Sequence, residues 1–325
     1  MSSVNPAPTP PRRWRDLALF GGLVALVIAG LVSAAAATGW AETMAQLGKL
    51  GAGQLGVLLA LSLVNYLFRG LRWHAFARRL GLPTTLGQNI RHFLGGFAMS
   101  VTPGRVGELI RMRWIRRETG WTFERTAPLV LIDRASDLAA MAIILGVSLA
   151  LAAGGITLAA PVAVLAFVSA IIVTRPTLLH TLATGFYRAT GLFPRLIARV
   201  RRAAQSLRAF SHPQTLSLAA GLGLIGWLAE GYAFHLLLVW MGADIGFWTA
   251  VMIFVFSTLA GGLTGAPGGL GGAEAAMVAL LMVEGVGADA AIAATAVIRL
   301  TTLWFAIAIG FAVFPHAEKK SKGGA

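Results

Sequence analysis

Five charged side chains lie in or beside strongly apolar segments, in two groups with nearly the same spacing. Glu108 precedes Arg134 by 26 residues, Glu274 precedes Arg299 by 25 residues, and Arg105 lies just ahead of the first group. Charges at membrane depth are costly, so they usually pair or line an aqueous path. A guanidinium offers a planar fork of donors that suits a phosphate, and a glutamate could be a counter-charge or proton carrier. The spacing therefore points to ion pairs, an anion site, or both.

Each glutamate follows a sequence that breaks a helix. Both breaks have the pattern P-G-x-x-G, beginning at Pro103 and at Pro267, and a glycine pair precedes each of them. Where a helix restarts after a break, its first N–H groups and the positive end of its dipole favour an anion. We predict helix breaks at the two prolines and a substrate site at Gly104, Arg105, Gly107, Glu108, Arg134, Asp137, Gly268, Gly269, Gly271, Glu274 and Arg299.

A purely structural role is the alternative for these charges. Glu108 with Arg134, and Glu274 with Arg299, could form ion pairs that hold each broken segment to its neighbour. The two hypotheses are compatible for some residues, and the sequence does not separate them. Glu230 and His235 interrupt another apolar segment and could join the same cavity.

The composition places these residues in a membrane. Of the 325 residues, 57% are hydrophobic and only 12% are charged, which predicts an all-α polytopic membrane protein. Six segments are long enough to cross a bilayer at about 20 residues each. They are 17–37, 52–70, 127–151, 156–174, 214–240 and 289–314.

The charges between the spans predict their orientation. One set of connections is strongly basic and the other is mostly acidic, so the basic set and both termini are predicted to be cytoplasmic, in a bacterial plasma membrane. The basic set contains Arg12, Arg13, Arg15, Arg69, Arg72, Arg78, Arg79, Arg111, Arg113, Arg116, Arg117, the arginines from Arg175 to Arg208, Lys319, Lys320 and Lys322.

Two further segments have charges of the same sign at both ends, so both ends of each segment should lie on the same side of the membrane. Arginines flank 86–118 and acidic residues flank 247–286, so each segment should enter the membrane and return as a re-entrant hairpin, from opposite faces. Matching breaks that enter from opposite faces indicate an inverted-topology repeat. We therefore predict one membrane domain at 17–315, with repeats at about 52–174 and 214–315, and cytoplasmic tails at 1–16 and 316–325.

The linker at 175–212 is basic and amphipathic. Leu196, Val200, Ala203, Leu207 and Phe210 fall on one helical stripe, with arginines away from it. Such a helix is typical of the interface with an anionic leaflet. An ordinary basic cytoplasmic loop is the alternative.

Several classes of function are disfavoured by the sequence. The chain has no cysteine, no P-loop pattern, no metal-ligand spacing among its six histidines and no G-x-S-x-G motif. GLGLIG at 221–226 lies inside a span without a preceding strand. The net charge of +14 sits at span ends, as a topology signal would place it, which argues against nucleic acid as a partner. We expect no cofactor, no metal and no catalysis.

Three stretches resemble a known family: TPGRVGELIRMRWIRRETG at 102–120, APLVLIDRASDLAAMAIILG at 127–146, and GAPGGLGGAEAAMVALL at 265–281. They are similar to the transmembrane region of lysylphosphatidylglycerol synthases, over about 15–315. That region also occurs in stand-alone members, some associated with hopanoid biosynthesis. In bifunctional multiple peptide resistance factors it is similar to a flippase for aminoacylated phosphatidylglycerol. Asp133 departs from the family pattern, which has a glutamate there, and the synthase domain is missing, so the resemblance implies no synthase activity.

These inferences lead to an expected function. The chain should flip an anionic lipid, such as an aminoacylated or other phospholipid, a polyprenyl phosphate or a hopanoid-related lipid, through a midplane cavity between the hairpins. The runner-up is a non-transporting membrane partner of lipid or hopanoid biosynthesis enzymes, and a homo-oligomer is compatible with either. A small-solute transporter and a membrane-embedded transferase are weaker alternatives.

Overall fold

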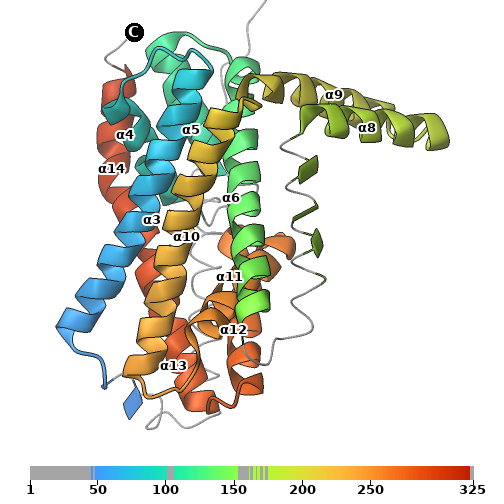
Figure 1. Ribbon diagram of the computed structural model, residues 1–325. Helices are drawn as coiled ribbons and strands as arrows, with labels where there is room; N and C mark the ends of the chain where they lie inside the picture. The colour runs from blue at the N-terminus through green and yellow to red at the C-terminus, as the bar shows by residue number, and fades with distance from the viewer. Residues whose placement is uncertain are drawn as a thin grey trace, which may run out of the picture.

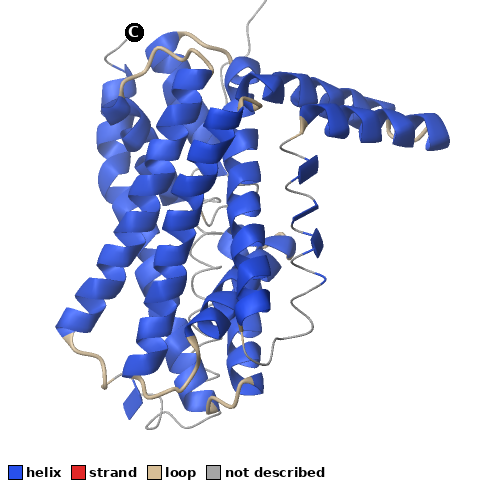
Figure 2. Ribbon diagram, in the orientation of Figure 1, coloured by secondary structure: helices blue, strands red, loops and turns tan. Residues whose placement is uncertain are grey.

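The computed structural model describes residues 48–100, 106–152 and 175–322, with positions 45, 46, 161, 164, 165, 167, 168, 171 and 172 besides. Figure 2 shows helices joined by loops throughout these ranges, without a strand. The all-α architecture predicted from composition is therefore confirmed. The predicted span 17–37 and most of 156–174 lie outside the described residues.

Among the residues that the structure describes, three helical stretches are long and apolar enough to cross a membrane: α3 (Ala52–Arg79), α10 (Pro213–Trp240), and the continuous run Ala288–Lys322. At a rise of 1.5 Å per residue, a helix of 28 residues extends about 42 Å, more than the roughly 30 Å of bilayer hydrocarbon. The run comprises α13 (Ala288–Arg299), a π-helical turn η4 (Leu300–Trp304) and α14 (Phe305–Lys322). A fourth long helix, α6 (Phe123–Leu151), lies alongside them in the bundle (Figure 1).

The two broken segments form hairpins that enter the bundle from opposite ends. The first consists of α4 (Leu86–Gly96), a 3-10 turn η1 (Phe97–Met99) and α5 (Val106–Thr119). It opens at the upper end of Figure 1, where α3 and α14 end. The second consists of α11 (Phe247–Leu263), η3 (Pro267–Gly269) and α12 (Gly272–Val283), and it opens at the lower end, where α10 ends and α13 begins.

The helix contacts repeat between the two halves of the chain. α3 and α10 lie side by side and run in opposite directions (Figure 1). α6 of the first half packs on α11 of the second hairpin, and α14 of the second half packs on α4 of the first hairpin. This exchange of partners is the arrangement expected when two inverted repeats are related by an axis in the membrane plane.

Glycines allow the two legs of each hairpin to touch. A methyl group on Gly107 would overlap the carbonyl oxygen of Gly96 in the facing leg. A Cβ atom on Gly261 would lie 2.7 Å from the Cβ of Ala273, which is closer than van der Waals contact allows. The glycine pairs noticed in the sequence therefore set the spacing of the legs.

The linker forms an arm of two helices, α8 (Pro176–Thr190) and α9 (Pro194–Leu207), which extends from the upper part of the bundle (Figure 1). The predicted amphipathic helix corresponds to α9. The predicted apolar stripe turns inward at its end: Leu207 and Phe210 are buried, and the Phe210 ring lies 5.6 Å from that of Phe76. Exposed apolar side chains occur instead on α8, at Leu178, Leu182 and Phe186. The interfacial location of the arm stays a prediction.

Candidate functional site

A cavity of about 620 Å³ lies where the inner ends of the two hairpins meet the long helices. The first hairpin, the second hairpin, α3, α6, α10 and the region from Arg299 to Ala306 all contribute to its wall. Non-helical backbone at membrane depth survives only where protein or a water-filled cavity shelters it. The cavity therefore accounts for the position of the second break, whose Gly268 and Gly269 line it.

Most of the predicted site residues that the structure describes line this cavity. They are Gly107, Glu108, Arg134, Asp137, Gly268, Gly269 and Arg299. Gly271 and Glu274 are not among its lining residues, although they lie in the same break. Pro103, Gly104 and Arg105 fall outside the described residues, as does the side chain of Pro267.

Both ion pairs expected from the spacing are present. Arg134 Nε lies 2.9 Å from Glu108 Oε1, and Arg299 Nε lies 2.6 Å from Glu274 Oε1. The first pair joins α5 to α6 and the second joins α12 to α13, so each hairpin is tied to the helix that follows it. The geometry of both pairs is therefore that of the structural alternative.

The second pair is also bonded to the backbone of its break. Glu274 Oε2 accepts a hydrogen bond of 2.7 Å from the N–H of Gly271, and Arg299 Nη2 donates one of 3.0 Å to the carbonyl of Gly268. Gly268, Gly269 and Gly271 have φ values of 64°, 69° and 81°, a region that favours glycine. Glu274 and Arg299 therefore satisfy two backbone polar groups of the break, the Gly271 N–H and the Gly268 carbonyl.

Two arginines on α3 were missed by the sequence analysis, which counted Arg69 and Arg72 as cytoplasmic topology signals. The predicted span ended at residue 70, but α3 continues to Arg79 and carries both side chains into the protein. Arg69 Nη2 lies 2.6 Å from Asp137 Oδ2, and Arg72 Nη2 lies 2.7 Å from Asp137 Oδ1. The spacing of Asn65, Arg69 and Arg72 on one helical face was the available signal.

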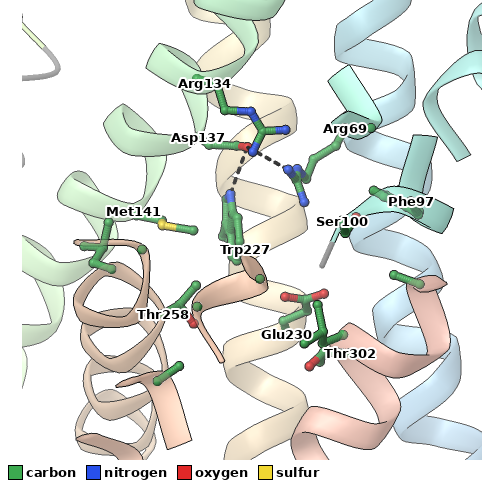
Figure 3. A pocket seen from close by; sticks show the side chains of 18 of the residues that line it. Arg69, Phe97, Ser100, Arg134, Asp137, Met141, Trp227, Glu230, Thr258 and Thr302 are labelled. Carbon is green, nitrogen blue, oxygen red and sulfur yellow. Dashed lines mark hydrogen bonds and ion pairs between the residues drawn. The ribbon is translucent and has the colours of Figure 1, made fainter. Parts of the chain in front are cut away.

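Asp137 is the centre of this cluster. Besides the two α3 arginines, its Oδ1 accepts a hydrogen bond of 3.2 Å from Trp227 Nε1, as Figure 3 shows. Arg72 Nη2 also lies 2.7 Å from Asp133 Oδ1, and Arg134 Nη1 lies 3.6 Å from Asp137 Oδ2. Two carboxylates one helical turn apart therefore neutralise arginines from their own helix and from α3.

Glu230 is the buried carboxylate that the cluster does not use. It lies on α10, is 5% exposed and lines the cavity near Thr302 (Figure 3). It makes neither an ion pair nor a hydrogen bond with the residues that the structure describes. His235 does not join it, because its ring packs on Phe247 at 5.5 Å, outside the cavity.

The wall next to Arg299 is a π-helical turn at Leu300–Trp304 rather than regular α-helix. Tyr66 on α3 donates a hydrogen bond from its hydroxyl to the backbone carbonyl of Thr302 in this turn. Such turns often occur at functional sites because they displace the side chains around them. The sequence predicted an uninterrupted span there.

Arg111 is a further arginine that the sequence analysis assigned to the cytoplasm. It lines the cavity and is only 3% exposed. Four arginines and three carboxylates thus belong to the described cavity wall: Arg69, Arg111, Arg134, Arg299, Glu108, Asp137 and Glu230. Within the described ranges, no group of three or more His, Cys, Asp or Glu side chains is arranged to hold a metal ion.

Comparison with known proteins agrees with this architecture. A family described as the lysylphosphatidylglycerol synthase TM region matches residues 18–310. Two proteins of Methanothermobacter thermautotrophicus, each called a UPF0104 membrane protein, are both 29% identical, over 119 and 136 residues. The matches cover 37% and 40% of this chain and 36% and 40% of those relatives, so the chain spans well under half their length. With most of its length matched, the chain belongs to the family of the lysylphosphatidylglycerol synthase transmembrane region.

Proposed function

We propose that the chain carries an anionic lipid from one leaflet of the membrane to the other. The observation that supports this most directly is the cavity between two oppositely oriented broken hairpins, with four arginines against three carboxylates in its described wall. Paired broken helices that meet near the midplane are where many transporters bind their substrate. The setting in the proposal is a bacterial plasma membrane, with both termini in the cytoplasm.

The cavity suits a charged head group better than a whole lipid. Its volume of about 620 Å³ is within the roughly 300–1,000 Å³ of small-molecule sites. Arg69 and Arg134 are held in place by carboxylates, so their remaining donors are oriented before a head group arrives. Acyl or isoprenyl tails would stay in lipid while the head group crosses. Candidates are phospholipids, including aminoacylated ones, polyprenyl phosphates and hopanoid-related anionic lipids.

Alternating access would follow from motion of one repeat against the other. The ion pairs tie each hairpin to the helix after it, so each hairpin can move with its own repeat as a rigid unit. The contacts of α6 with α11 and of α14 with α4 lie between repeats and would change in such a motion.

A second candidate is a non-transporting partner of lipid-synthesis enzymes. The observation that favours it is the extent of charge pairing, because Arg69, Arg72, Arg134 and Arg299 each already face a carboxylate. Charges that only pair would stabilise a static scaffold.

Reconstitution distinguishes the two candidates. Liposomes that contain the purified chain and a fluorescent phosphatidylglycerol, with and without a proton gradient, are treated with a membrane-impermeant quencher. The transport proposal expects label from the inner leaflet to become accessible faster than in protein-free liposomes. Arg134→Gln should slow this by on the order of tenfold, since a charge-assisted contact is lost. Arg125→Gln, an exposed arginine of the same helix, should have no effect.

Two results would contradict the transport proposal or the role of Arg134 in it. If fluorescent phosphatidylglycerol, phosphatidic acid and a polyprenyl phosphate all move no faster than in protein-free liposomes, the transport proposal is wrong and the scaffold is favoured. Wild-type rates in Arg134→Gln would remove this arginine from the mechanism.

A further inference from the structure

Arg111 differs in its surroundings from the other arginines of the cavity. It lies on α5, in the inner part of the first hairpin, and is 3% exposed. It shares the cavity wall with Glu108, one helical turn earlier on the same helix. Arg113, two residues later, is partly exposed and pairs with Glu318 at 2.6 Å outside the cavity. The neighbouring arginines of one helix are thus in two different environments.

Aromatic rings enclose the Arg111 guanidinium. Its central carbon lies 4.3 Å from the ring centroid of Phe93, 5.4 Å from that of Trp73 and 5.7 Å from that of Phe97. A ring face attracts a cation within about 6 Å, so these contacts stabilise the charge. Its stem also packs against Gly96, where a Cβ atom would overlap Arg111 Nε. The rings and the glycine hold the side chain in one orientation.

No carboxylate of the described residues pairs with Arg111. Its Nε and Nη1 atoms are buried and have no hydrogen-bond partner there. Arg69, Arg134 and Arg299, the other arginines of the wall, each lie within 2.9 Å of a carboxylate oxygen. A buried charge whose donors are unpaired is costly, and cation–π contacts do not satisfy N–H donors. An anion that accepted hydrogen bonds from this rigidly held guanidinium would neutralise its charge, so Arg111 is a suitable anion-binding residue.

The geometry points to Arg111 as the residue that binds the phosphate of the transported lipid, an inference that rests on the proposed function. A guanidinium can donate two parallel hydrogen bonds to a phosphate, and the three rings present it as a fixed plane. Arg134 and Arg299 have fewer free donors for the phosphate, since Glu108 pairs with Arg134 and both Glu274 and the Gly268 carbonyl engage Arg299. The ligand chemistry is a phosphate ester, which could come from a lipid or from free phosphate.

A binding experiment on the purified full-length chain in detergent separates these sources. The probes are dioctanoyl-phosphatidylglycerol, dioctanoylglycerol, which has the same chains without phosphate, and inorganic phosphate. The wild type should bind the first and gain thermal stability from it, with little response to the other two. Arg111→Met should bind it at least about tenfold more weakly, since charged hydrogen bonds are lost. Arg113→Gln should bind like the wild type.

The melting temperature of Arg111→Met without lipid distinguishes an arginine that binds the lipid from one that only stabilises the fold. Because an uncompensated buried charge is removed, the melting temperature without lipid should equal or exceed that of the wild type. A large decrease together with unchanged phosphatidylglycerol affinity would overturn the inference. If Arg111→Met does not fold, Arg111→Lys decides: it keeps the charge but not the fork, so weaker binding supports the inference and unchanged binding overturns it. Stabilisation by inorganic phosphate alone would overturn the assignment to a lipid.

The inference and the proposed function fail in different ways. A chain that binds phosphatidylglycerol through Arg111 but moves no lipid would contradict transport only. Lipid movement at the wild-type rate in Arg111→Met, with unchanged affinity, would contradict the role of Arg111 and leave transport standing.

Discussion

Arg69 on α3 and Asp137 on α6, 68 residues apart in the sequence, meet at 2.6 Å beside the cavity. The same carboxylate lies 2.7 Å from Arg72 and accepts a hydrogen bond from Trp227 on α10. One aspartate therefore connects three helices of the bundle. Its loss should affect stability as well as any function of the cavity.

Asp137→Asn should destabilise the protein. Removing the Asp137 charge leaves buried Arg69 without its carboxylate and leaves Arg72 with Asp133 alone, and breaking a buried pair in this way costs about 3–5 kcal/mol. The measurement is the unfolding midpoint in detergent. Asp244→Asn, at an exposed acid, should leave the midpoint unchanged. Equal midpoints for Asp137→Asn and the wild type would show that the cluster does not hold the helices together.

Glu274→Gln should loosen the second hairpin more than Glu108→Gln loosens the first. Glu274 uses one oxygen for Arg299 and the other for the Gly271 N–H, and an amide has only one acceptor oxygen. Arg134, by contrast, keeps contacts of 3.6 Å with Asp133 and Asp137 after Glu108 is neutralised. Hydrogen exchange of the amides at 268–275 should speed up about tenfold in Glu274→Gln, and that of the amides at 107–112 should speed up less in Glu108→Gln. The exposed Glu284→Gln is the control, and an equal increase at the two hairpins would refute the prediction.

Glu230→Gln should remove the response of lipid movement to a proton gradient. Glu230 is the carboxylate of the described wall that makes no ion pair, so it can gain or lose a proton without breaking one. Tyr66, Arg69, Asp137 and Arg299 face the same cavity. The reconstituted wild type should move labelled phosphatidylglycerol at a rate that changes when the gradient is imposed, and the variant should not. A gradient effect that persists in Glu230→Gln would exclude this carboxylate as the proton site.

Single cysteines test the orientation, because the chain has none of its own. Thr122→Cys lies between the first hairpin and α6, close to the basic residues at the upper end, and Glu284→Cys lies between α12 and α13. The excess of arginine near the first site predicts that it faces the cytoplasm. A membrane-impermeant maleimide should therefore label Glu284→Cys in intact cells and Thr122→Cys only after lysis. The opposite pattern would invert the predicted topology.

The hairpins and their ion pairs could be predicted from the sequence because each depends on residues close together in the chain. Pro267 and the glycines up to Gly271 break a helix locally. Glu274 and Arg299 lie on consecutive helices, α12 and α13, which a short loop joins. Flanking charges near each hairpin then indicate opposite entry. Composition alone is enough to identify the membrane class, since a soluble fold could not cover so much apolar surface.

The tertiary structure decided which arginines belong to the cavity. Arg69, Arg72 and Arg111 occur in basic stretches at predicted span ends, so counting charges along the chain assigns them to the cytoplasm. Their surroundings come from distant segments: Asp133 and Asp137 for the α3 pair, and the rings of Trp73, Phe93 and Phe97 for Arg111. An arginine can be buried only where other helices supply a counter-charge or a ring face. That depends on how the helices pack, which local sequence does not encode.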